Sequence, residues 1–184
     1  TPEMIKALPK SRYAHTSEPI DFAALKGKRV AVLGAGASAF DNAQFALNEG
    51  VAEAHVFVRK NKLPQVNPIR FMERTGVIPR FAAFTDAEKY DAISYFLNVN
   101  QPPTNDTFQR AAAWPGFKLH LGAPWEAVRE TPDGVEVTTP KGVFTFDFLI
   151  LSTGLVTDPA LREELEGLAP KIACWRDRLP KLDG

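Results

Sequence analysis

Hydrophobic and polar positions follow two different periods along this chain, and each period predicts a kind of element. The apolar run within Arg29–Leu33 is short enough for a strand that is buried on both faces. From Ala37 onward, apolar residues recur at helical spacing until Gly50, where we expect the helix to end. A second apolar run over 54–58 predicts another strand. Strand, glycine turn, helix and strand in this order are typical of a βαβ unit in a parallel sheet.

The segment after this unit has a helical period that prolines interrupt. A short helix is expected over 69–74, and the run Thr-Asp-Ala-Glu at 85–88 predicts a capped helix start. Another helix is expected over 105–112, so a helical insert at about 68–116 is predicted. Its aromatic residues are expected to form the core of the insert rather than a substrate pocket: Phe71, Phe81, Phe84, Tyr95, Phe96, Phe108 and Trp114.

The period changes to two over about 117–146, which predicts a β-meander of short strands. The individual strands are expected at 118–121, 126–130, 135–139 and 143–146. The apolar run Asp147–Ser152 then predicts a buried strand that leads into Thr153 and Gly154. Beyond it, a helix is expected over 158–165 and a short strand at 174–176.

The turn after the first strand reads Gly-Ala-Gly-Ala-Ser-Ala, which is the spacing of a dinucleotide-binding loop. Gly34 allows a tight turn, and Gly36 lets a pyrophosphate approach the backbone. Ala39 takes the third glycine position, where a small residue lets helix and strand pack closely. Ala37 and Ser38 begin the helix, whose N–H groups and positive dipole end face the anion, and Ser38 adds a hydroxyl. The pattern therefore predicts these five residues as cofactor ligands.

A basic pair follows the second strand, where a site that reads the ribose of NAD usually carries an acid. Arg59 and Lys60 occupy this place, and the stretch 56–62 contains no Asp or Glu. One charge-assisted contact to a 2′-phosphate contributes about 1.5–3 kcal/mol, so the pair favours NADP over NAD. Lys62 is a weaker candidate. The alternatives are a solvated strand end for the pair and an adenosylmethionine site for the turn.

The whole order of elements predicts an α/β fold, a Rossmann-like parallel sheet with a β-meander and a helical insert. We expect a linker segment at 1–28, an NAD(P)-binding domain at 29–158 and a C-terminal segment at 159–184. The chain begins at Thr1 and ends in loop-like sequence, which is what we expect of a fragment of a longer protein.

Composition narrows the classes of function. The 184 residues balance 22 Lys and Arg against 22 Asp and Glu, so neither a nucleic-acid partner nor a membrane surface is indicated, and a cytoplasmic location is expected. A single cysteine, Cys174, excludes a disulfide framework and the dithiol pair of disulfide reductases. The histidines, cysteine and carboxylates lack metal-ligand spacing. His120 is expected to be structural, and His55 is expected either to pack or to face solvent.

Together these residues resemble the NADPH-binding domain of class B flavoprotein monooxygenases, which are the flavin-containing monooxygenases and their Baeyer–Villiger relatives. The resemblance rests on the glycine turn, on Arg59 after the second strand and on the run Asp147–Gly154, and it covers most of the chain. Of the linker signature of this family, the chain retains His15 but not the aromatic and glycine positions.

The resemblance implies an enzyme with two dinucleotides. NADPH binds this domain and passes a hydride to FAD in a second domain, and the reduced flavin takes up O₂ to oxygenate a small-molecule substrate. Thr153 and Gly154 match the residues that lead the family's chain back toward the flavin. Because this chain has one glycine turn, the FAD-binding domain is expected in a part of the parent protein that the chain lacks, and the fragment alone is expected to turn nothing over.

Two other functions stay open at this point. The chain would suit a non-catalytic domain that senses a dinucleotide, or a reductase that uses a single NAD(P) cofactor on a small carbonyl. A reductase of this kind is expected to carry a Tyr-x-x-x-Lys pair, but none of Tyr13, Tyr90 and Tyr95 has a lysine four residues on.

Overall fold

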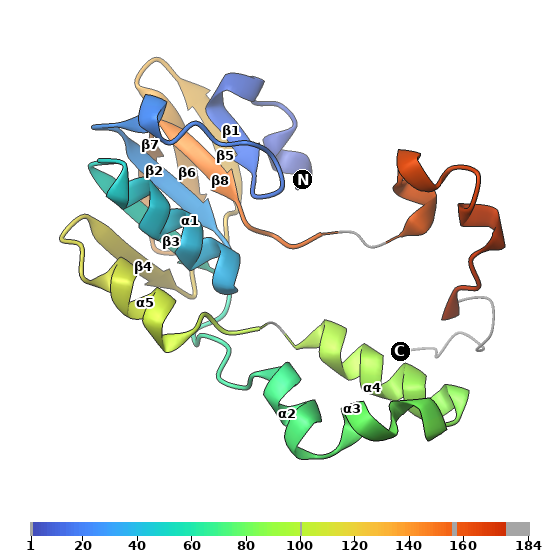
Figure 1. Ribbon diagram of the computed structural model, residues 1–184. Coiled ribbons are helices and arrows are strands. Elements are labelled where there is room, and N and C mark those ends of the chain that lie inside the picture. Colours follow the sequence, from blue (N-terminus) through green and yellow to red (C-terminus); the bar gives the residue numbers. More distant parts are fainter. Residues whose placement is uncertain (1, 100, 156–157, 176–184) are drawn as a thin grey trace. The chain divides into compact units, whose positions relative to one another are not determined.

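A five-stranded parallel sheet forms the centre of the computed structural model, which describes residues 2–99, 101–155 and 158–175 (Figure 1). Its strands lie in the order β1 (Tyr13–His15), β8 (Phe148–Leu151), β2 (Arg29–Leu33), β3 (Glu53–Val58) and β4 (Phe117–Leu121). The chain leaves β2 outward through β3 and β4 and returns on the other side of β2 as β8. This reversal beside the central strand is the Rossmann arrangement, and it confirms the predicted α/β fold class.

Helix α1 (Ala37–Asn48) and helix α5 (Asn105–Ala112) cover one face of the sheet. Alternate residues of the strands point to this face, so that Val32 and Val56 join Phe40 in a fully buried cluster. The ring centroids of Phe40 and Phe108 are 5.6 Å apart, which ties α5 to α1. The face is therefore apolar throughout, as expected for a parallel sheet covered by helices.

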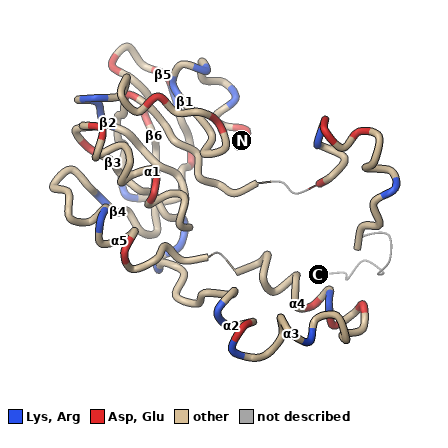
Figure 2. Tube along the Cα trace, in the orientation of Figure 1, with Lys and Arg blue, Asp and Glu red and all other residues tan. Residues whose placement is uncertain are grey.

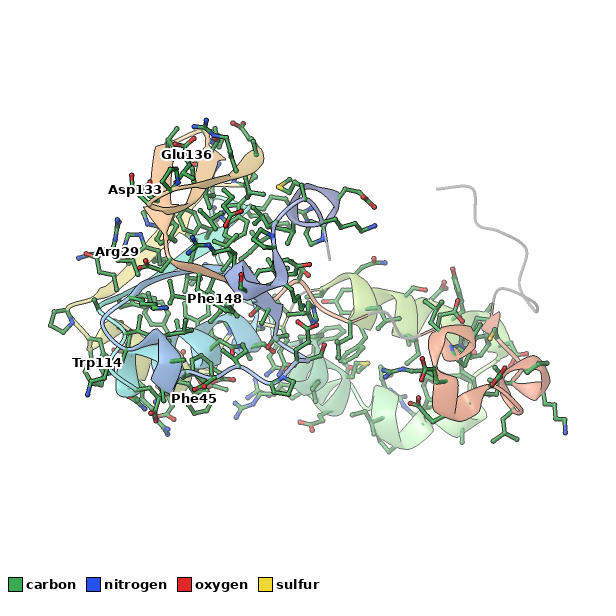
Figure 3. The ribbon with its side chains drawn as sticks, turned by 90° about the horizontal axis from the view of Figure 1, so that it is seen from above. Arg29, Phe45, Trp114, Asp133, Glu136 and Phe148 are labelled. Carbon is green, nitrogen blue, oxygen red and sulfur yellow. The ribbon has the colours of Figure 1, made fainter. Side chains whose placement is uncertain are left out.

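A three-stranded antiparallel meander covers the other face with β5 (Ala127–Thr131), β6 (Gly134–Thr139) and β7 (Gly142–Phe146). Phe57 and Phe146 are buried between the two sheets, where their ring centroids lie 5.7 Å apart. Figure 3 shows the layers from above, with Phe45 of α1, Phe148 of the sheet and Glu136 of the meander in succession.

A second compact unit comprises Pro68–Val99 and Gly154–Gly184, whereas Thr1–Asn67 and Asn100–Thr153 form the unit described above. It contains α2 (Pro68–Arg74), α3 (Val77–Arg80) and α4 (Asp86–Asn98). The predicted cap of α4 is confirmed, because Thr85 and Glu88 exchange both hydrogen bonds of a capping box. Its remaining elements are 3-10 turns at Phe81–Ala83, Pro159–Leu161, Glu163–Leu165 and Ala169–Lys171.

Several elements differ from the expectations. The meander expected over 117–146 loses its first strand, because β4 pairs in parallel with β3 rather than with β5. The linker segment 1–28 contributes a strand, β1, as well as 3-10 turns at Glu3–Ile5, Lys10–Arg12 and Ala23–Leu25.

The C-terminal expectations also need correction. The helix expected over 158–165 is two 3-10 turns, with Asp158 capping the first. Cys174 and Trp175 are not in a strand, and Arg176 lies outside the described residues.

The aromatic residues of the insert do not form one core. Phe108 packs into the sheet unit, whereas Phe71 and Tyr95 contact each other but stay 45% and 41% exposed. Over the described ranges, every helix is too short or too polar to cross a membrane.

Candidate functional site

The carboxyl ends of the five parallel strands lie at one edge of the sheet, where β2 and β8 are neighbours. Gly34 follows β2, Ser152 follows β8, and the amide of Ser152 donates to the carbonyl of Leu33 at 2.8 Å. The strand order reverses beside β2, because the chain continues from β2 to β3 on one side and returns as β8 on the other. Ligands of doubly wound sheets bind at such a point.

Gly34 lets the ends of β2 and β8 and the first turn of α1 lie close together because it has no side chain. A Cβ atom at Gly34 would lie 2.5 Å from the carbonyl oxygen of Ser152 and 3.1 Å from the Cβ of Ala39. Real Cβ atoms essentially never approach within 3.0 Å of another heavy atom, so β2, β8 and α1 can meet here only around glycine. Ala39 is itself fully buried, which explains why this position is also small.

Gly36 lies in a different environment at the start of α1. A Cβ here would meet a single described atom within 4 Å, the carbonyl oxygen of Gln101 at 3.4 Å. Gly36 is the N-cap of α1, and no described side chain caps the helix or brings an acid into its first turn. Ala37 is half-buried and Ser38 is exposed. The uncapped helix end and the absence of a side chain at Gly36 therefore suit the backbone N–H groups to hold an anion.

The side chain of Asn42 holds the first turn of α1 in place. Its Nδ2 donates to the carbonyl of Ser38 at 2.7 Å and to Oγ1 of Thr16 at 2.8 Å. Thr16 follows β1, and its own amide donates to the carbonyl of Leu151 at 3.0 Å. The start of the helix is thus tied to the ends of β1 and β8.

Arg59 and Lys60 follow β3 at the same edge. The amide of Ala123 donates to the carbonyl of Val58 at 2.9 Å, and that of Gly122 donates to the carbonyl of Lys60 at 2.8 Å. The backbone of the pair is therefore held on both sides. Both side chains are exposed, and within the described ranges neither makes an ion pair or a side-chain hydrogen bond. Figure 2 shows basic and acidic residues interspersed along the labelled elements.

Thr153 and Gly154 come directly after Ser152 and are both exposed. Gly154 has a φ of +86°, a conformation that glycine adopts at little cost, and it begins the second unit. The structure thus gathers Gly34, Gly36 and the start of α1 at the carboxyl ends of β2 and β8. It places Arg59 and Lys60 at the end of the next strand.

The role of Ser152 escaped the sequence patterns. The hydroxyl of Ser152 is a buried polar atom without a hydrogen-bond partner in the described structure. A signal was present, because Ser152 is the one polar residue closing the run Phe148–Leu151.

His55, which is buried, and His120, which is half-buried, form a pair beneath the meander. Nε2 of His120 lies 3.1 Å from Nδ1 of His55, and Nε2 of His55 lies 3.2 Å from a carboxylate oxygen of Glu53, which also accepts from Arg29. Because the carboxylate only accepts, His55 donates through Nε2 and accepts from His120. Burial lowers the pKa of His55 to about 4 and also lowers the pKa of His120. Both are neutral at pH 7, and their packing role agrees with the prediction.

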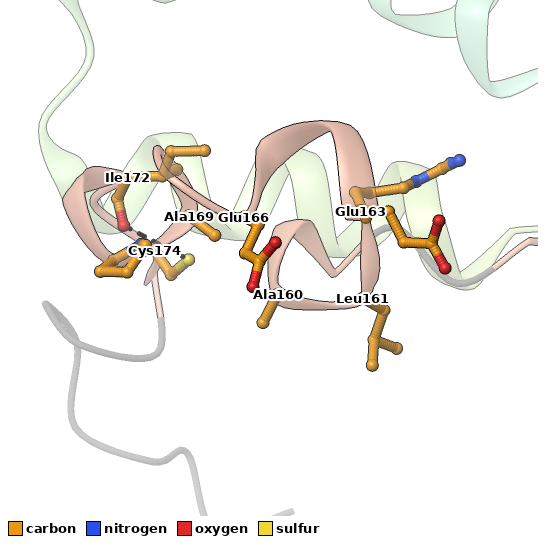
Figure 4. A pocket seen from close by; sticks show the side chains of 9 residues that line it. Ala160, Leu161, Glu163, Glu166, Ala169, Ile172 and Cys174 are labelled. Carbon is orange, nitrogen blue, oxygen red and sulfur yellow. Dashed lines mark hydrogen bonds between the residues drawn. The ribbon is translucent and has the colours of Figure 1, made fainter.

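A hollow of 860 Å³ lies within the C-terminal segment, between Ala160 and Cys174 (Figure 4). Its walls are 3-10 turns, and Leu161 on its rim is 69% exposed. The thiol of Cys174 donates to the carbonyl of Ile172 at 3.7 Å. The hollow belongs to the second unit and contains none of the predicted site residues. Among the described residues, no group of three or more histidines, cysteines or carboxylates is placed to hold a metal.

Comparison with known proteins gives a close relative for part of a longer chain. No family model matches the sequence. The chain is 65% identical over 178 residues to a FAD-dependent urate hydroxylase of Xanthomonas campestris. This match covers 96% of the chain but only 38% of the hydroxylase.

Solved structures share the fold at low identity. Ornithine hydroxylase (PvdA) of Pseudomonas aeruginosa matches 92% of the chain with a TM-score of 0.67 and 23% identity, over 46% of its own length. L-lysine 6-monooxygenase of Pseudomonas syringae matches 92% with a TM-score of 0.65 and 21% identity, again over 46% of its length. The predicted resemblance to flavin-dependent monooxygenases is confirmed, for a chain that matches less than half of such proteins.

Proposed function

We propose that this chain is the NADP(H)-binding portion of a longer FAD-dependent hydroxylase. The observation that carries the proposal is the edge at β2 and β8, where an uncapped helix start and an open glycine face a topological switch point. The identity of 65% to part of a FAD-dependent hydroxylase supports the same conclusion. The FAD-binding domain would lie in the part of the protein that this chain does not cover.

Each predicted residue has a role in this proposal. The amides at the start of α1, from Ala37 and Ser38, bind the pyrophosphate, and Gly36 leaves room for its approach. Arg59 faces the 2′-phosphate with Lys60 beside it, because both cations are exposed and unengaged in the described structure. Bound NADPH would supply a hydride to the flavin. The residues of this chain bind and orient the dinucleotide.

Thr153 and Gly154 would carry the chain from the cofactor edge toward the rest of the protein. Their place directly after β8 supports this role, since the strand ends at the same edge as the glycine turn. A positive φ at Gly154 lets the chain change direction there without strain.

The substrate of the longer protein is proposed from the relative. A FAD-dependent urate hydroxylase acts on urate, and high identity over this portion makes urate the first substrate to test. The test uses the full-length polypeptide loaded with FAD and follows NADPH oxidation with and without urate. Oxidation that urate does not accelerate would remove urate from the proposal and leave the binding role of this chain intact.

Cofactor binding is tested on the chain itself by titrating NADPH and NADH calorimetrically. We expect NADPH to bind more tightly, and Arg59→Ala to weaken NADPH binding by roughly tenfold while leaving NADH unchanged. Lys28→Ala is the matched control, because it removes an exposed cation just before β2, at the opposite edge of the sheet. Equal affinities for the two dinucleotides in the wild-type chain would contradict the 2′-phosphate assignment.

A further inference from the structure

The hydroxyl of Ser152 is buried but has no hydrogen-bond partner among the described residues. In the described part of the chain, two buried side-chain polar atoms lack a hydrogen-bond partner, Oγ of Ser152 and Nε1 of Trp125. Trp125 lies in the apolar cluster under the meander. Ser152 directly follows β8, at the edge of the sheet where the proposed function places the dinucleotide. Burying a hydroxyl without a partner costs free energy, so serine at this position suggests that the hydroxyl gains a partner that the described structure does not contain.

The neighbouring contacts fix where this hydroxyl lies. The backbone of Ser152 is held by the hydrogen bond from its amide to the carbonyl of Leu33. The Cβ of Ser152 lies 3.0 Å from the position that a Cβ on Gly34 would take, and the Cβ of Ala39 lies 3.1 Å from that same position. Ser152 and Ala39 therefore both border Gly34 of the glycine turn. One rotation about its Cα–Cβ bond moves the hydroxyl between staggered positions without moving the backbone.

We propose that the hydroxyl of Ser152 donates a hydrogen bond to the pyrophosphate of the bound dinucleotide. This inference rests on the proposed function and adds a binding residue that directly follows β8, outside the glycine turn. The backbone amides at the start of α1 and the Ser152 hydroxyl after β8 then hold the same anion. A phosphate oxygen is a strong acceptor, so the hydroxyl that lacks a partner in the described structure gains a charge-assisted one on binding.

A competing explanation is that Ser152 holds a permanent structural water and has no part in binding. The two explanations differ in what Ser152→Ala does to the chain without dinucleotide. If the hydroxyl has no partner until the dinucleotide binds, alanine removes an unpaired polar group. The unfolding midpoint is then equal to that of wild type or up to about 2 °C higher. If the hydroxyl is bonded to a structural water, the midpoint falls.

The experiment combines thermal unfolding of the chain with calorimetric titration of NADPH, for wild type, Ser152→Ala and Ser152→Thr. We expect Ser152→Ala to bind NADPH about three- to tenfold more weakly without loss of stability, and Ser152→Thr to keep more of the affinity than alanine does. Ser11→Ala, at an exposed serine in the 3-10 turn Lys10–Arg12, is the control and should change neither property.

The outcomes separate this inference from the proposed function. A wild-type chain that does not bind NADPH overturns both. Wild-type binding with equal affinity in Ser152→Ala overturns the role of the hydroxyl alone. A lower unfolding midpoint for unliganded Ser152→Ala also overturns it, because the hydroxyl would then already have a partner.

Discussion

The two glycines of the turn should respond in opposite ways to alanine, because one is needed for packing and the other for access. In Gly34→Ala the new Cβ would lie 2.5 Å from the backbone oxygen of Ser152, about 1 Å inside ordinary contact. Neither partner can yield easily, since Ser152 is hydrogen-bonded to β2 and Ala39 is fully buried in α1. Overpacking of this kind costs about 1–3 kcal/mol, which lowers the unfolding midpoint by roughly 3–10 °C.

Gly36→Ala should leave stability almost unchanged. Its φ of −92° and ψ of 179° suit alanine, and the nearest described atom would be the Gln101 carbonyl oxygen at 3.4 Å. Alanine is a poorer N-cap than glycine but reduces the entropy of the unfolded chain, and these effects, each about 0.5–1 kcal/mol, offset one another. The methyl group nevertheless occupies the space that a pyrophosphate needs, so we expect NADPH binding to fall by at least tenfold.

Urea denaturation of both variants, with NADPH titration of each, tests this reasoning. The expected pattern is a destabilised Gly34→Ala chain and a stable Gly36→Ala chain that has lost binding. Equal destabilisation of the two would refute the distinction between packing and access. A stable Gly36→Ala chain that binds NADPH like wild type would refute the proposed position of the pyrophosphate.

Three further predictions concern the fold. The pKa of His55 is about 4 in the fold and about 6.5 when unfolded, so the unfolded chain binds more protons between these pH values. Acidification from pH 7 to 4 should therefore lower the free energy of unfolding by about 1–3 kcal/mol through this residue. His55→Gln should remove this part of the pH dependence in a series of denaturation curves. Phe57→Ala removes a fully buried ring and should cost about 3–5 kcal/mol in urea denaturation, whereas a loss below 1 kcal/mol would contradict the core described here. Thr85→Ala removes the cap of α4 and should lower the circular dichroism signal of helix slightly, with a cost of about 1 kcal/mol if the second unit folds cooperatively with the first.

Local chemistry explains why the βαβ unit could be predicted from the sequence. The helix α1 begins after Gly36 and ends before Gly50, and both boundaries follow from residues within a few positions. The same holds for the α4 start, where Thr85 and Glu88 complete the capping box between themselves. Each of these features depends on neighbours in the sequence, so the pattern alone carries the information.

Strand pairing could not be predicted in the same way. Over β4, Phe117, Leu119 and Leu121 alternate with polar residues just as the meander strands do. A period of two identifies a strand but not its neighbour, and the partner of β4 is β3, more than fifty residues earlier. Strand β1 has only three residues, too few for a period, and exists because β8 pairs with it.

The C-terminal segment shows why a helix cannot be predicted from its cap alone. Asp158 caps the amide of Ala160, as a helix start requires, but the turn that follows ends after Pro159–Leu161. No described residue of the resulting 3-10 turns is buried. Helices of this length depend on packing an apolar face, and a favourable cap does not replace that packing.

The determinants of the proposed cofactor site are distributed over three strands, and this distribution separates binding from choice of dinucleotide. The features for the pyrophosphate lie at the ends of β2 and β8, where Gly34 and Ser152 are in contact and both are tied to the core. Arg59 follows β3, where backbone hydrogen bonds hold the residues on both sides of it. Its side chain is exposed and makes no ion pair or side-chain hydrogen bond in the described structure. Changes at Arg59 can therefore alter specificity without disturbing the fold. Changes at Gly34 cannot, because the strand and the helix meet there.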